Sequence, residues 1–238
     1  MSSSLLLLLR GPLQSWGDAS RFLDRATAAQ PTKSGVLGLV AAAQGRRRTD
    51  PLEDLAALSF AVRVDQPGAL TRDYQTAERW QTGGGTSLVS RYYLSDAVFL
   101  AAIGAQDRAL VEGIREALRS PRFPLYLGRR SCPANPDLVG DAASSIVDLS
   151  PVEALRGAPW RASRAHRRTR PREVRLPIFR DGEPGERGES RQDVPISFDQ
   201  EHRRYGWRTV VADEEGALVE NPEGSTATDP FFEEVVSA

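Results

Sequence analysis

The chain has 238 residues, of which 40% are hydrophobic and 26% are charged, and its formal net charge is −1. This length suits one large domain or two small ones with a buried core. Cys132 is the only cysteine, which excludes an internal disulfide and a cysteine-based zinc site. The apolar run at residues 5–9 is shorter than a signal-peptide core of ~7–15 residues, and no run approaches the ~20 residues of a membrane span. We therefore expect a cytoplasmic protein with no membrane contact.

Charge is distributed unevenly along the chain. Residues 213–238 contain eight acids and no Lys or Arg, and removing these acids from a total of −1 leaves +7 for residues 1–212. A basic body with an acidic tail indicates a polyanionic partner. Lys33 is the only lysine, and Arg supplies the other basic charges, an excess that GC-rich coding also explains. Whatever its origin, Arg offers a planar fork that pairs with phosphate and stacks on bases.

Apolar periodicity and turn residues predict the order strand, helix, strand, strand, helix, strand in residues 1–133. The expected elements are a strand at 5–10, helices at 34–44 and 50–58, a strand at 59–65, a hairpin at 70–94 with its tip at 83–85, a strand at 96–104, a helix at 106–119 and a strand at 123–127. This order is the ferredoxin-like plan, an α+β fold. We expect residues 134–212 to form a smaller β-rich region, with strands at 174–180, 194–198 and 207–212. Residues 213–238 are predicted to be an acidic, mobile tail.

The start of the helix at 34–44 combines a cation, two hydroxyl groups and free backbone N–H groups, in Pro31, Thr32, Lys33, Ser34 and Gly35. The helix dipole and the unpaired N–H groups favour a phosphate there. The segment is not a P-loop, because a P-loop has Gly directly before the Lys. An ordinary Ser/Thr helix cap is the alternative interpretation.

A second basic segment follows the strand expected at 123–127. Gly128, Arg129, Arg130, Ser131 and Cys132 form a turn that suits an RNA backbone, and a solvated basic loop is the alternative.

The hairpin interleaves aromatic and guanidinium side chains, which suits stacking on unpaired bases. These side chains are Arg72, Tyr74, Arg79, Trp80, Arg91, Tyr92 and Tyr93. Cross-strand pairing that only holds the hairpin together is the alternative.

The arginine-rich run at 161–172 is interpreted as a flexible basic face that also attracts polyanions. His166 and His202 are the only histidines, and both are interpreted as surface residues. No spacing resembles a zinc or calcium site, so neither a metal nor a cofactor is expected.

Four motifs of the chain resemble, in order, those of the CRISPR-associated Cas-five family, and within it the CasD-type subunits of type I-E Cascade. They are residues 7–17 (LLLRGPLQSWG), 31–39 (PTKSGVLGL), 71–76 (TRDYQT) and 124–133 (PLYLGRRSCP). The resemblance implies a ferredoxin-like (RRM-related, RAMP-type) fold with a protruding hairpin thumb. It also implies a non-catalytic subunit that caps the 5′ handle of CRISPR RNA (crRNA) in antiviral defence. The implied partners are the crRNA, the Cascade backbone subunit, the large subunit that reads the PAM and, through the assembled complex, target DNA.

The expected RNA contacts combine the motif residues with the hairpin. They are Gln14, Trp16, Thr32, Lys33, Ser34, Gly35, Arg72, Tyr74, Arg91, Gly128, Arg129, Arg130 and Ser131. The alternative function is a metal-independent CRISPR repeat endoribonuclease of the type I-C kind, which uses a Tyr, a Lys and a His. This chain departs from that pattern, because its sole lysine lies in the helix-start motif and no histidine precedes His166. A generic RNA-binding module outside CRISPR is a third hypothesis.

Overall fold

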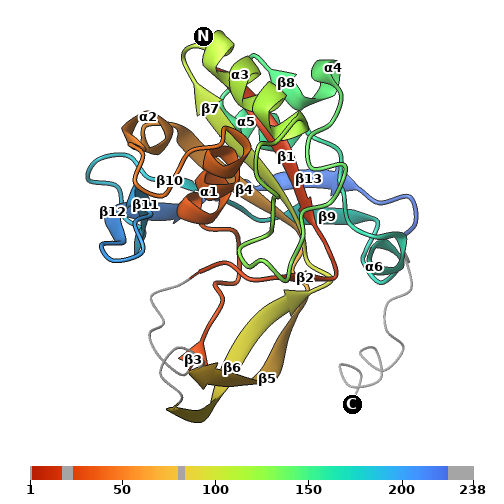
Figure 1. Ribbon diagram of the computed structural model, residues 1–238. Coiled ribbons are helices and arrows are strands. Elements are labelled where there is room, and N and C mark those ends of the chain that lie inside the picture. The colour runs from red at the N-terminus through yellow and green to blue at the C-terminus, as the bar shows by residue number, and fades with distance from the viewer. Residues whose placement is uncertain (1, 18–23, 80–83, 225–238) are drawn as a thin grey trace, which may run out of the picture.

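The computed structural model describes residues 2–17, 24–79 and 84–224, and its largest element is a seven-stranded antiparallel sheet (Figure 1). In spatial order the strands are β11 (Glu189–Ser197), β12 (Arg204–Ala212), β10 (Ile178–Asp181), β4 (Ser59–Gln66), β7 (Val98–Ala105), β1 (Ser3–Arg10) and β8 (Ile146–Val147). The strands β10, β11 and β12 follow residue 133 in the chain. The C-terminal region therefore extends the sheet that the N-terminal region begins.

One face of the sheet is covered by α1 (Lys33–Ala43) and α3 (Arg108–Arg119). Because side chains alternate along a strand, Leu5, Leu7 and Leu9 of β1 all point to this face and pack with the apolar sides of the two helices. The short helix α2 (Glu53–Ala56) follows α1 and places Leu55 in the same core.

The other face of the sheet is covered by α5 (Pro151–Gly157) and by the two-stranded ribbon of β9 (Glu173–Leu176) and β13 (Ala217–Glu220). Leu6 and Leu8 of β1 pack against this second core. Because both faces of β1 are covered, the strand is an unbroken run of leucines rather than an alternating one.

The hairpin of β5 (Ala69–Arg79) and β6 (Gly84–Ser95) projects from the main sheet (Figure 1). The short strands β2 (Leu13–Gln14) and β3 (Asp24–Arg25) pair with β6 and complete a separate four-stranded sheet. The predicted hairpin is thus confirmed. Trp80 of the predicted hairpin and Gly83 of its expected tip lie outside the described residues.

The strands predicted at 5–10, 59–65 and 96–104 and the helices predicted at 34–44 and 106–119 are confirmed within about two residues. The strand predicted at 123–127 is wrong, since this segment makes only one isolated bridge, between Tyr126 and Pro133. The segment instead wraps around the end of α1, where the N–H groups of Arg122 and Phe123 donate to the carbonyls of Ala43 and Ala42. The place beside β1 is taken by β8, which follows α4 (Ala142–Ser145).

Two C-terminal predictions also need correction. The strand predicted at 174–180 is split, because Pro177 separates β9 from β10, and the two strands belong to different sheets. The acidic segment predicted to be mobile from Asp213 is built into the fold as far as Gly224. Asp213 pairs with Arg156 at 2.7 Å, and β13 pairs with β9. The remaining acids of the predicted tail lie outside the described residues.

Candidate nucleic-acid interface

A groove of about 770 Å³ runs along the solvent side of α1 and brings three distant segments together. Its floor is the small-residue face of the helix, formed by Ser34, Gly35, Gly38, Ala41 and Ala42. One wall is the loop at 123–130, and the opposite wall is the end of the β11–β12 hairpin. The helix-start motif and the Gly128 turn, which lie far apart in the sequence, are thus parts of one surface.

The groove is lined by five arginines and, among the described residues, by no acid. Arg46, Arg47 and Arg48 follow the end of α1, Arg130 belongs to the Gly128 turn, and Arg203 precedes β12. A hydrogen bond to Asp54 raises the pKa of Arg46 and holds its guanidinium in place. One sign of charge lining a concave surface concentrates a polyanion there.

Aromatic side chains lie between the arginines of the groove. Phe123 and Tyr126 come from the loop after α3, and Phe198 and Tyr205 come from the β11–β12 hairpin. The rings of Phe198 and Tyr205 meet edge to face, with centroids 6.5 Å apart. Alternating rings and guanidinium groups provide both stacking surfaces for bases and partners for phosphates.

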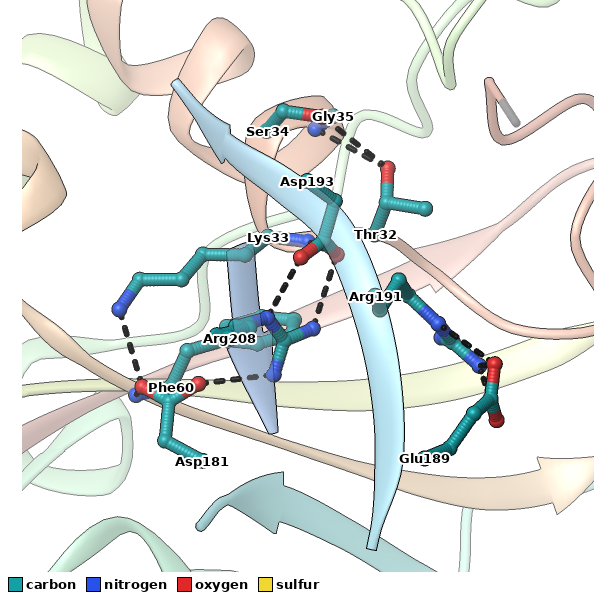
Figure 2. Close-up of polar contacts among 10 residues, drawn as sticks. All are labelled: Thr32, Lys33, Ser34, Gly35, Phe60, Asp181, Glu189, Arg191, Asp193 and Arg208. Carbon is teal, nitrogen blue, oxygen red and sulfur yellow. Dashed lines mark hydrogen bonds and ion pairs between the residues drawn. The ribbon is translucent and has the colours of Figure 1, made fainter. Parts of the chain in front are cut away.

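Lys33 points its ammonium group at Asp181 (Figure 2) and is not among the residues that line the groove. Its side chain is only 7% exposed, and its Nζ lies 2.9 Å from Oδ2 of Asp181 on β10. Its backbone N–H donates to Oδ2 of Asp193 on β11 at 2.9 Å. The anion at the start of α1 is therefore a carboxylate of the protein itself. The expectation that this lysine contacts an RNA phosphate is corrected by this arrangement.

Arg208 on β12 completes the buried ionic cluster (Figure 2). Its guanidinium binds Asp193 at 2.6 and 2.8 Å and Asp181 at 2.7 Å. Burial alone would lower the pKa of Arg208, but the hydrogen bonds and charges of the two carboxylates raise it on balance. The cluster of Lys33, Asp181, Asp193 and Arg208 is thus charge-balanced, and it fastens α1 to the C-terminal strands.

Gln14 and Trp16 are fully buried and act on the shape of the site. The amide of Gln14 donates to the carbonyls of Leu9 and Ala97 and accepts from Nε1 of Trp16. A Cβ atom at Gly35 would lie 2.8 Å from the Trp16 ring, so only glycine lets the helix start approach that ring. The Trp16 ring therefore packs inside the protein, whereas the sequence had predicted an RNA contact for this residue.

Gly128 packs against the residue that precedes Trp16. Its φ is +86°, and a Cβ atom there would lie 1.6 Å from the carbonyl oxygen of Ser15. The N–H of Ser15 donates to the carbonyl of Leu127. Thr32 caps α1 by accepting from the N–H of Gly35, so its hydroxyl is also engaged.

The turn after Gly128 points its side chains in different directions. Arg129 lies over the ring of Tyr93 at 4.8 Å, whereas Arg130 and Ser131 are exposed. Burial raises the pKa of the Cys132 thiol, which packs in the core. Burial would also raise the pKa of Tyr93, but its contacts with Ser131 and Arg129 lower it on balance.

The predicted hairpin residues form a separate surface, and none of those that the structure describes is among the residues that line the groove. The Arg72 guanidinium lies 4.2 Å from the ring centroid of Tyr74, whose side chain is 59% exposed, and donates to Ser90. Arg91 is half-buried and belongs to the opposite face of the hairpin. The structure therefore assembles Thr32, Ser34, Gly35, Gly128 and Arg130 in one groove and leaves Arg72, Tyr74 and Arg91 outside it.

Sequence reasoning missed part of the groove. One usable signal for a polyanion site was the run of three arginines, Arg46, Arg47 and Arg48, directly after the glycine that ends the helix. Arg203 and Tyr205 had no local signal, because only the pairing of β11 with β12 brings them to α1.

Across the part of the chain that the structure describes, no group of three or more His, Cys, Asp or Glu side chains is arranged to hold a metal ion, and no helix is long and apolar enough to cross a membrane. Burial and the nearby Arg170 charge lower the pKa of His166, which lies on α6 (Arg164–Arg168).

Comparison with known proteins gives consistent matches. The sequence profile of the family described as CRISPR-associated protein (Cas_Cas5) matches residues 4–211. The chain is 37% identical to the CRISPR system Cascade subunit CasD of Escherichia coli (strain K12) in an alignment 178 residues long that covers 64% of this chain and 79% of the relative. It is similar to a chain of a CRISPR RNA-guided surveillance complex, with a TM-score of 0.75, 31% identity and 98% coverage of both chains. It is also similar to a crystal structure of a Cas protein, with a TM-score of 0.66, 36% identity and coverage of 94% of this chain and 98% of the other.

Proposed function

The chain belongs to the Cas5 family of CRISPR-associated proteins, and we propose that it is a non-catalytic Cascade subunit that holds the 5′ handle of crRNA in the groove along α1. The single observation that carries this proposal is the groove itself. Five arginines and four aromatic rings line it, no described acid does, and three of the four family motifs meet in it.

The strand order supports a ferredoxin-like core for this subunit. The order β8, β1, β7, β4, with α1 after β1 and α3 after β7, follows the ferredoxin-like connection of strand, helix, strand, strand, helix, strand. The strands β10, β12 and β11 extend this core beyond β4 and supply the wall of the groove that carries Arg203 and Tyr205.

Within this proposal the motif residues divide into two roles. Ser34, Arg130 and Ser131 contact the RNA backbone, and Gly35 and Gly128 allow the close packing against Trp16 and Ser15 that shapes the groove. Gln14, Trp16, Thr32 and Lys33 hold the walls of the groove in position. Arg129 supports the turn through its stacking on Tyr93.

The hairpin supplies a second contact with the same RNA. The exposed Tyr74 ring, braced by Arg72, is a platform for a base that leaves the groove, and Arg91 on the other face contacts the backbone. We further propose that the subunit assembles with the Cascade backbone subunit and the large PAM-reading subunit, and meets target DNA only through that complex.

Binding without cleavage is the favoured activity. Metal-independent cleavage of the type I-C kind requires a lysine near the reacting phosphate, and here the only lysine is held in a buried pair with Asp181. A histidine general acid or base would have to be His166 or His202, and neither is among the residues lining the groove.

The test uses the purified chain and a fluorescent RNA that carries the handle of the CRISPR repeat beside its gene. The triple variant Arg47→Ala, Arg48→Ala, Arg130→Ala should bind at least tenfold more weakly. Its salt dependence should also fall by about 2 units of log–log slope, at roughly 0.7 per lost contact with a single strand. The control variant Arg168→Ala, Arg170→Ala, Arg172→Ala removes the same charge from exposed positions at the end of α6 and directly after it. It should leave handle binding nearly unchanged.

Two results would refute the proposal. One is an unchanged slope in the groove variant, because a lost phosphate contact must change it. The other is cleavage of the RNA that disappears in His166→Ala or His202→Ala, which would make the chain an endoribonuclease.

A further inference from the structure

Residues 161–175, which contain α6 and its flanks, carry seven arginines and a single acid, Glu173. Six of the seven arginines are exposed, and Arg167 is half-buried. Figure 1 shows α6 beyond the ends of β9 and β13, well separated from α1. The arginine cluster is therefore not a part of the groove.

This segment is rigidly anchored at its first end. Asp65 of β4 accepts from the backbone N–H of Arg161 at 2.6 Å, and its carbonyl accepts from Nε1 of Trp160 at 2.8 Å. Asp65 is itself held by the fully buried guanidinium of Arg63. The hydroxyl and the N–H of Ser163 both donate to Gln66.

The second end of α6 is fastened by a buried amide. Nδ2 of Asn221 donates to the carbonyls of Arg167, Arg170 and Pro171 at 2.8, 3.3 and 2.8 Å. The turn is thus fixed against β13, and its exposed side chains project from a stable backbone. Sequence patterning had indicated a flexible face, but these contacts make it a preorganised one.

The charge of the cluster is only partly balanced by the protein. Glu223 lies 3.4 Å from Arg164 and 3.3 Å from Arg167. Among the described residues, no ion pair involves Arg161, Arg168, Arg170 or Arg172. Nε of Arg170 donates to His166. The other guanidinium N–H groups of these four arginines, in α6 and its flanks, thus present forks that match phosphate oxygens.

We propose that the α6 surface, made by the arginines of residues 161–172, is a second nucleic-acid-binding surface that grips the phosphate backbone of a duplex. Trp160, which directly precedes this segment, is buried and packs edge-on to His166 with centroids 6.2 Å apart. It offers no ring on which a base can stack, and stacking is what retains single strands. The surface therefore reads phosphates without reading sequence.

The α6 surface is tested with the same full chain, using one short DNA duplex and the RNA duplex of the same sequence at low salt. The triple variant Arg168→Ala, Arg170→Ala, Arg172→Ala should lose at least tenfold in duplex affinity. Its salt slope should fall by about 2 to 3 units, at roughly 0.9 per lost contact with a B-form duplex. The matched control is Arg47→Ala, Arg48→Ala, Arg130→Ala, which removes equal charge from the groove and should retain duplex binding.

The two duplexes identify the natural ligand, since tighter binding of the DNA duplex points to target DNA and tighter binding of the RNA duplex to a folded RNA. The proposal is overturned if the α6 variant binds both duplexes as the parent does, or if the two triple variants lose duplex affinity equally. The equal loss would mean that only net charge matters. Handle binding is measured with a separate single-stranded RNA, so failure of the groove proposal would appear with that probe and not with the duplexes.

Discussion

Replacing Lys33 with methionine separates the two roles that this residue could have. If its ammonium contacted a phosphate, Lys33→Met would lower the salt slope of RNA binding by about 0.7 units. The buried pair with Asp181 predicts the opposite pattern. The slope should stay unchanged, and the free energy of unfolding should fall.

The size of that loss follows from the geometry. Unit charges 2.9 Å apart attract by about 6 kcal/mol at an effective dielectric constant of 20. Desolvation of both groups offsets part of this, and breaking a buried pair typically costs about 3–5 kcal/mol. Asp181 is 26% exposed and retains Arg208 and the N–H of Phe60. We therefore expect Lys33→Met to destabilise the chain by about 2–3 kcal/mol.

Urea unfolding measures the loss, from the shift of the midpoint at constant m. Asp137→Ala is the matched control, because Asp137 pairs with Arg10 at 2.8 Å on the surface, where such pairs contribute less than about 1 kcal/mol. A Lys33→Met protein as stable as the control variant, with a reduced salt slope, would refute the structural role.

Three further predictions concern other parts of the chain. Gly128→Ala should cost more than about 3 kcal/mol in urea unfolding, since a Cβ atom would collide with the Ser15 carbonyl and the φ of +86° disfavours alanine; a smaller loss would mean that the turn yields easily. The hydrogen bond from Arg180 lowers the pKa of Glu186 from 4.5 to about 2, so the stability that this pair contributes is present above pH 4.5 and is lost as the pH falls toward 2. The difference in unfolding free energy between the parent and Glu186→Gln should shrink over that range. A constant difference would contradict the assignment. Gly224, the last described residue, lies beside the end of the α6 segment, since a Cβ atom there would be 2.7 and 2.5 Å from the carbonyl oxygens of Arg170 and Pro171. Deleting residues 225–238 removes the three acids that follow Gly224, so duplex affinity should rise at low salt. An unchanged affinity would show that these acids do not act at α6.

The N-terminal elements could be predicted because local pattern and packing agree there. The leucines of β1, the Gly45 that follows α1 and the apolar stripe of α3 each specify an element within a few residues. The segment at 123–127 has an equally strand-like pattern, but at its start the backbone N–H of Phe123 donates to a carbonyl at the end of α1. Hydrophobic periodicity does not encode such a contact.

The role of Lys33 could not be predicted from its neighbours in the chain. Asp181 and Asp193 come 148 and 160 residues later, and only the register of β10, β11 and β12 brings them under α1. The glycines of the motifs gave a correct hint of close approach. What approaches them is a buried tryptophan and a backbone carbonyl rather than a ligand.

The position of Asp193 late in the chain also determines when, during translation, the groove along α1 can be completed. A nascent chain that has reached residue 133 contains the helix and the Gly128 turn, but neither the anion that caps the helix nor Arg203 and Tyr205. The groove is therefore completed only when β11 and β12 have left the ribosome. If the groove holds RNA as we propose, a nascent subunit therefore offers no finished RNA site until these last strands of the sheet have joined it.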